Sequence, residues 1–256
     1  MIDVNVSISR WPFRRLPDDE TPRLAARLRR HGVTRAWTGS FDALLHLDIA
    51  AVNERLAEEC RKHGGGLLVP FGAVNPALPD WEEDLRRCRE VHRMPGIRLH
   101  PNYHGYTLDD PAFRKLLDAA ARAGLIVQLA VTMEDERTQH PLVRVPPVDV
   151  APLAGILKDL PGLRLVILNG LRTMKEEVVE TLAAAGVAGF DLAMLEGIDG
   201  LGRMIRRIDP GKILFGSNAP LFTFESAPLK LTEAALDPAA ERAVCEGNAL
   251  RLLDRH

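Results

Sequence analysis

The chain has 256 residues, of which 46% are hydrophobic and 27% charged, and its formal net charge is −2. This length suits one large domain or two small ones, and the apolar fraction is enough to build a sizeable core. The near-neutral charge, without a sustained basic run, argues against nucleic acid or an anionic membrane as a partner.

The expected location is the cytoplasm. The N-terminus shows no basic leader followed by an apolar segment, and no apolar run approaches the ~18 residues that a membrane helix needs. The cysteines Cys60, Cys88 and Cys245 are sparse, odd in number and without C-x-x-C spacing, which fits a reducing compartment and predicts buried thiols for the first two.

Apolar runs of strand length alternate with helical periodicity along the chain. The predicted strands cover 2–8, 34–38, 67–74, 97–100, 126–132, 163–169, 190–195 and 212–217. The predicted helices cover 22–30, with Thr21 as N-cap, and 48–63, 81–92, 111–123, 149–160, 175–185, 201–208 and 233–253. The intervening loop 133–147 is long and polar, and such loops in compact domains are usually functional.

This succession predicts a single domain over residues 1–256, folded as a closed (β/α)8 TIM barrel. The runs 67–74 and 213–215 are apolar at consecutive positions, as in parallel strands covered on both faces. An open doubly wound sheet is the alternative, and the lack of a glycine-rich phosphate loop after the first strand weighs against it.

Polar residues gather where the predicted strands end, which in such a barrel is the catalytic face. The densest group is Gly96–Tyr106, which holds both tyrosines and two of the eight histidines. Alternation places Asp3, Asn5 and Ser7 on one face of the first strand and Gln128, Ala130 and Thr132 on one face of the fifth. Buried polar groups need partners or water, so we expect a wet, polar barrel mouth.

Several stretches resemble the amidohydrolase-related family, the "amidohydrolase 2" branch of the metal-dependent hydrolase superfamily. They span nearly the whole chain in the right order: Ile2-Asp3-x-Asn5-x-Ser7, Val69-Pro70-Phe71-x-x-Val74-Asn75-Pro76, Gly96-Ile97-Arg98-Leu99-His100-Pro101, Pro161-x-Leu163-Arg164-Leu165-Val166, Ile213-Leu214-Phe215-Gly216-Ser217-Asn218-Ala219-Pro220 and Gly247-Asn248-Ala249-Leu250-Arg251-Leu252-Leu253. The resemblance implies a TIM barrel with a hydrolytic site at its mouth.

The resemblance also implies a metal centre, and here the sequence departs from the family. The usual pattern is His-x-His on the first strand, one His on each of the fifth and sixth, and an Asp after Gly-Ser on the eighth, which together hold one or two divalent metals. The corresponding positions are Asn5, Ser7, Ala130, Asn169 and Asn218. Because zinc sites need imidazole, thiolate or carboxylate ligands, we expect no metal and no other cofactor.

His100 is the predicted catalytic residue, as an acid/base group at a strand end; the alternative is a histidine bonded to backbone at the rim. Arg98 is predicted to bind a substrate carboxylate through its guanidinium, or else to pair with Asp3 or Asp191. The predicted substrate-binding set is completed by Tyr103, His104, Asn5, Ser7, Gln128, Asn169 and Asn218.

For the flanking loops, we expect Arg14 and Arg15 to be surface residues, with anion binding as the alternative, and 134–136 to be a solvated acidic run. The alternative reading of Tyr103 and His104 is an ordered loop with satisfied aromatic side chains.

Two functions follow as hypotheses. The first is a metal-independent hydrolase that acts on a small carboxylated or lactone-type substrate. The second is a catalytically inactive relative, a ligand-binding or regulatory protein that has lost its metal site. The sequence leaves open the substrate, a homo-oligomeric state and whether the loop 133–147 closes over a ligand.

Overall fold

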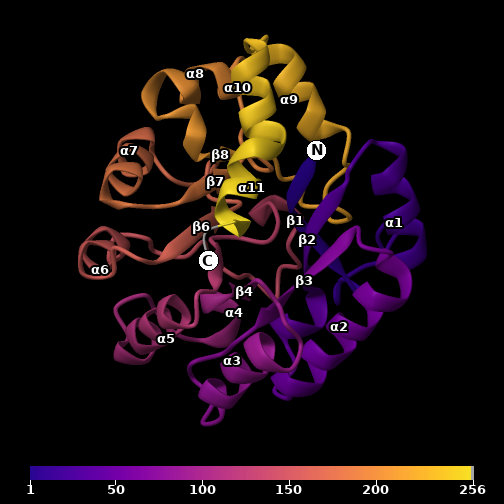
Figure 1. Cartoon of the computed structure of the whole chain (residues 1–256), viewed down its shortest axis with the longest axis vertical. Coiled ribbons are helices and arrows are strands. Elements are labelled where there is room, and N and C mark those ends of the chain that lie inside the picture. Colours follow the sequence, from indigo (N-terminus) through magenta and orange to yellow (C-terminus); the bar gives the residue numbers. More distant parts are fainter. Residues whose placement is uncertain (255–256) are drawn as a thin grey trace.

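The computed structural model describes residues 1–254 and has eight parallel strands in one sheet, ordered as in the sequence (Figure 1). The strands are β1 Ile2–Ile8, β2 Arg35–Ser40, β3 Leu68–Ala73, β4 Gly96–Leu99, β5 Ile126–Ala130, β6 Arg164–Leu168, β7 Gly189–Asp191 and β8 Ile213–Leu214. The sheet closes where Val4 N donates to Phe215 O and Ser7 N to Ala219 O, both at 2.9 Å. The predicted TIM barrel is confirmed, and the open sheet is excluded.

Helices surround the barrel. They are α1 Thr21–Arg30, α2 Ile49–Gly64, α3 Trp81–Glu90, α4 Pro101–His104, α5 Pro111–Arg122, α6 Leu153–Asp159, α7 Glu176–Ala185, α8 Gly200–Arg207, α9 Ser226–Ala234, α10 Pro238–Arg242 and α11 Asn248–Leu253. Short 3-10 segments cover Phe41–Leu44, Glu136–Thr138 and Pro210–Lys212, and a π-helical segment covers Ala243–Gly247.

Several predicted boundaries are wrong. The predicted helix 233–253 is broken, because Ala235 adopts a left-handed φ of 44° and Pro238 cannot continue a hydrogen-bonded helix; α9 ends before Ala235 and α10 begins at Pro238. Glu20, not Thr21, is the N-cap of α1. The segment that follows β4 contains the single helical turn α4.

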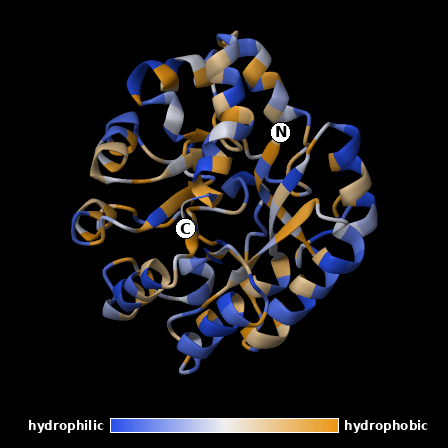
Figure 2. Ribbon diagram, viewed as in Figure 1, coloured by the Kyte–Doolittle hydropathy of each residue, from blue (hydrophilic) through white to orange (hydrophobic). Residues whose placement is uncertain are grey.

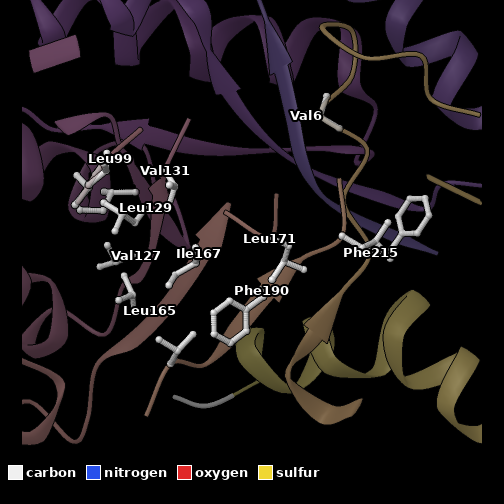
Figure 3. Close-up of a cluster of buried hydrophobic side chains, with 14 of the residues drawn as sticks. Val6, Leu99, Val127, Leu129, Val131, Leu165, Ile167, Leu171, Phe190 and Phe215 are labelled. Carbon is white, nitrogen blue, oxygen red and sulfur yellow. The ribbon is translucent and has the colours of Figure 1, made fainter. Parts of the chain in front are cut away.

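Alternation along the strands builds two apolar layers. Val127, Leu129 and Val131 point outward into the large cluster between sheet and helices, in which Figure 3 shows them beside Leu165 and Ile167. Figure 2 shows the corresponding colour pattern, with apolar strands inside and polar outer helix faces.

Inside the barrel, apolar side chains fill the end where the strands begin. Trp37 and Phe71 stack there with ring centroids 4.8 Å apart, and Leu252 of α11 packs on the same cluster. Cys60 and Cys88 are buried, as predicted. Among the described residues, no helix is long and apolar enough to cross a membrane.

Candidate active site

The barrel interior turns polar towards the ends of the strands. Eight polar side chains there are each at most 3% exposed: Asp3, Asn5, Ser7, Arg98, Gln128, Asn169, Asp191 and Asn218. Strand alternation brings these side chains together as predicted. An apolar cluster that includes Trp11, Phe41, Met133 and Leu221 packs among the loops beyond the strands. The expectation of a wet, polar mouth stays a prediction.

Arg98 lies across the barrel, and all five of its N–H groups point at protein acceptors. Its Nε donates to Gln128 Oε1 at 2.9 Å, Nη1 to Val6 O and Ser7 Oγ, and Nη2 to Val4 O and Trp37 O. Burial lowers the pKa of Arg98 to about 10, so it stays charged at neutral pH.

Because every N–H group of Arg98 already donates to a protein acceptor, the guanidinium has no donor left for a substrate anion in this structure. The guanidinium instead links β1, β2, β4 and β5 by hydrogen bonds, and it pairs with neither Asp3 nor Asp191. We therefore assign Arg98 to the scaffold of the site. Gln128 has the same role, because its Nε2 donates to Val4 O at 2.6 Å while its Oε1 receives Arg98.

Two carboxylates are buried in this polar interior, Asp3 on β1 and Asp191 at the end of β7. Asp3 accepts hydrogen bonds from the backbone N–H groups of Asn5 and Ser217, both at 3.0 Å, and from Ser217 Oγ at 2.5 Å. Burial outweighs these bonds and raises the pKa of Asp3 to about 7. Asp191 accepts from Asn5 Nδ2 at 2.8 Å and from Asn169 N at 2.6 Å, and burial raises its pKa as well.

The asparagines of the predicted site bond mainly to the protein. Asn5 Nδ2 also donates to Asn169 Oδ1 at 2.8 Å, and Asn169 Nδ2 donates to Thr132 O at 2.9 Å. Asn218 Nδ2 donates to Met133 O at 3.0 Å, but its buried Oδ1 meets no hydrogen-bond partner within residues 1–254. Asn169 and Asn218 both adopt left-handed φ values, 57° and 56°, which asparagine tolerates better than most residues.

His100 follows β4 directly and is 3% exposed. Burial, then His104, then Arg98 hold the pKa of His100 well below its ordinary value of 6.5, so the imidazole is neutral at pH 7. Its Nδ1 is enclosed and meets no acceptor or donor in the described part of the chain. His100 lines a cavity of about 10 Å³ together with Tyr103, Thr132 and Met133, a volume that suits about one water molecule.

The aromatic residues of the Gly96–Tyr106 group point to different surroundings: Tyr103 and His104 lie on the helical turn α4, and Tyr106 follows it. His104 contacts the His100 ring edge to face, with centroids 6.0 Å apart, and its Nε2 lies 2.8 Å from Ala43 O. Tyr103 packs against the apolar cluster at the mouth. Tyr106 points into the core, where its ring lies 5.9 Å from that of Phe113.

Sequence reasoning missed a larger cavity at this face. It measures about 360 Å³, lies beyond β5, β6 and β7, and shares Thr132 with the small cavity at His100; Glu134, Arg172 and Met194 also line it. The signal for Arg172 was its place just after Asn169, at the end of β6.

Charged loop residues border this cavity. Glu134 is buried and pairs with Arg14 at 2.6 Å, so the prediction of a solvated acidic run fails at this residue. Arg14 itself is exposed, as predicted. Asp135 accepts a hydrogen bond from Arg172 at 2.8 Å and also pairs with Arg137. Arg15 is exposed, as predicted, and pairs with the buried Asp19 at 2.6 Å.

The side chains at the five positions where the resemblance implies metal ligands do not fit a divalent metal. Asn5, Asn169 and Asn218 are amides, Ser7 is a hydroxyl and Ala130 offers no ligand atom, and Asn5 donates a hydrogen bond to Asn169. Residues 1–254 contain no group of three or more His, Cys, Asp or Glu side chains placed to hold a metal ion. Neutral amides carry no charge to compensate a dication, so we derive no chemistry through a metal here.

The closed eight-stranded topology, with polar side chains at the strand ends, defines a TIM barrel whose candidate site lies at its mouth. The chain belongs to the amidohydrolase family, whose model matches residues 10–255. No curated protein sequence matches it significantly.

Solved structures share the fold at low sequence identity. A 2,6-dihydroxybenzoate decarboxylase from Rhizobium aligns with a TM-score of 0.74 and 14% identity, covering 98% of this chain and 97% of that one. A 5-carboxyvanillate decarboxylase from Sphingomonas paucimobilis gives 0.75 and 13%, covering 98% of both chains. A probable 2-pyrone-4,6-dicarboxylic acid hydrolase from Acinetobacter baumannii, with citric acid bound, gives 0.68 and 13%, also covering 98% of both chains. At these identities, the similarity establishes the fold.

Proposed function

We propose that the protein is a metal-independent hydrolase of a small carboxylated substrate, such as a lactone or a similar ester. The observation that carries this proposal is His100, a neutral buried imidazole beside a cavity of about 10 Å³ at the end of a barrel strand. A neutral imidazole within reach of one water molecule has the chemistry of a general base.

In the proposed reaction, His100 takes a proton from the water while the water oxygen adds to the ester carbonyl. The bond between the carbonyl carbon and the ester oxygen then breaks, and the leaving oxygen takes that proton back from His100. A lactone thereby gives a hydroxy acid, and the imidazole is neutral again. Because Nδ1 of His100 is enclosed, Nε2 is the ring nitrogen left to face the water. Asn218, whose Oδ1 lacks a partner among the described residues, is the amide best able to orient water or substrate.

Space for the substrate is present in the cavity of about 360 Å³, which falls within the usual range for small-molecule sites. Thr132 and the segment 145–148 separate it from His100. Asn102 Nδ2 holds this segment by donating to Pro146 O at 2.5 Å. We propose that the loop 133–147 acts as the lid, whose movement joins the two cavities. The similar structures are two decarboxylases and a probable dicarboxylic acid hydrolase, and these activities support a carboxylated substrate.

A ligand-binding protein without catalysis is the second candidate. The residues at the metal-ligand positions of the resemblance favour it, because Asn5, Ser7, Ala130, Asn169 and Asn218 supply no charged ligand or imidazole for a hydrolytic metal.

A panel of carboxylated lactones and esters separates the two functions. Turnover that falls at least 100-fold in His100→Ala and is unchanged in His63→Ala, on the outer helix α2, supports the hydrolase. Tight binding of a panel compound without any turnover would establish the binding protein instead.

A further inference from the structure

The structure contains a set of buried polar atoms behind His100 that the proposed reaction does not use. His100 Nδ1, His104 Nδ1 and the Tyr106 hydroxyl are all enclosed, and none has a hydrogen-bond partner in residues 1–254. Leaving such a group without a partner is energetically unfavourable. Two of the three lie on adjacent imidazole rings, which suggests that those two groups serve each other.

The backbone determines which nitrogen of His104 carries the proton. Its Nε2 lies 2.8 Å from the carbonyl oxygen of Ala43, a group that can only accept a hydrogen bond. Nε2 must therefore hold the proton. Burial lowers the pKa of His104, so the ring is neutral at pH 7 and its Nδ1 is a bare acceptor.

His100 has the complementary requirement. To take a proton on Nε2 as a general base, the neutral ring must carry its own proton on Nδ1. That Nδ1–H then needs an acceptor on its enclosed side. The neighbouring ring is that of His104, which packs edge to face against His100 with centroids 6.0 Å apart at 78°.

We propose that His104 is a positioning residue that fixes His100 as its Nδ1–H tautomer. The chain runs from the Ala43 carbonyl to His104 Nε2–H, and from His104 Nδ1 across one bridging water to His100 Nδ1–H. The chain leaves His100 Nε2 free as the base. When His100 becomes an imidazolium during catalysis, His104 Nδ1 stabilises the charge through the same bridging water. No covalent bond forms in this chain.

This role of the chain in catalysis rests on the proposed hydrolase, but the tautomer itself can be measured without substrate. Long-range ¹⁵N–¹H spectra of the histidine rings at pH 7 report which nitrogen carries the proton. We expect the Nδ1–H form for His100 and the Nε2–H form for His104 in the wild type. His104→Phe should convert His100 to a mixture or to the Nε2–H form, whereas His104→Gln, which keeps an acceptor, should retain more of the original tautomer.

Two further variants are controls. His63→Phe changes a histidine on the outside of the barrel, and Tyr106→Phe removes only the neighbouring hydroxyl; both should leave the His100 tautomer unchanged. Circular dichroism confirms that each variant is folded. The proposal is overturned if wild-type His100 is the Nε2–H tautomer, or if folded His104→Phe keeps the wild-type signal.

Kinetics add a second readout if the protein turns over a panel substrate. His104→Phe should lower kcat by roughly tenfold or more with KM little changed, and His104→Gln should recover part of the loss. Equal kcat in wild type and His104→Phe would also overturn the proposal. If His100 shows the expected tautomer but no panel substrate is turned over, the hydrolase proposal is refuted, whereas the proposal that His104 fixes the tautomer of His100 still stands.

Discussion

The buried carboxyl of Asp3 should make folding stability depend strongly on pH. Its pKa rises from 3.8 to about 7 on folding because it loses water and, among residues 1–254, gains no cationic partner within hydrogen-bond distance. A carboxyl with a raised folded-state pKa holds its proton more tightly when folded. Its contribution is therefore complete below about pH 4 and is lost as pH rises through about 7. At 1.36 kcal/mol per pKa unit, the loss is about 4 kcal/mol.

Asp3→Asn removes this titration while keeping the shape of the side chain and an acceptor oxygen for the N–H groups of Asn5 and Ser217. Urea unfolding of both proteins at a series of pH values measures the difference in their free energies of unfolding. From about pH 4 to about pH 8, this difference should move by about 4 kcal/mol in favour of the variant. The matched control is Asp118→Asn, which alters an exposed pair with Arg122 and should move by less than about 1 kcal/mol. A movement of under about 1 kcal/mol for Asp3→Asn would refute the reasoning.

Three further predictions concern the site and its scaffold. Because His100 is neutral down to a pH well below 6.5, kcat/KM on a panel substrate should stay level from pH 8 to 6.5 and fall only on further acidification; a fall centred at or above 6.5 would contradict this. Arg98→Met should lower the free energy of unfolding by about 3 kcal/mol or more in urea, since it removes five buried hydrogen bonds. Gly39→Ala should also destabilise, because its Cβ would lie 2.8 Å from Arg98 Nη1; full stability in both variants would show that the guanidinium does not hold the strands together. Tyr106→Phe should be neutral or stabilising by up to about 1 kcal/mol in thermal unfolding, since it removes a hydroxyl that lacks a partner among the described residues, and a loss above 1 kcal/mol would mean that the hydroxyl is bonded.

The barrel could be predicted well, because its strands and helices leave a periodic pattern of apolar residues in the sequence. Alternation placed Asp3, Asn5 and Ser7 inside the barrel and Val127 and Leu129 outside, as the structure has them. The short strands β7 and β8 were overestimated, since apolar residues continue beyond the last ladder hydrogen bond.

The site was less predictable, because its partners come from distant parts of the chain. Arg98 was a plausible anion anchor until its bonds to β1 and β2 were known, and no local pattern shows that five acceptors converge on it. Glu134 read as a solvated residue for the same reason, since its partner Arg14 lies 120 positions away. The alternation of residues along the strands identified which polar side chains point into the barrel. Only the three-dimensional structure shows which of them still have a donor or acceptor free to bind a substrate.

The most direct test of the account is the hydrolysis of carboxylated lactones and esters by protein that has been treated with a chelator and desalted, with metal content verified by elemental analysis. The account predicts turnover at a metal content on the order of a tenth of an equivalent or less, and its loss in His100→Ala. Turnover that appears only when zinc or manganese is added back, or that survives in His100→Ala, would contradict it.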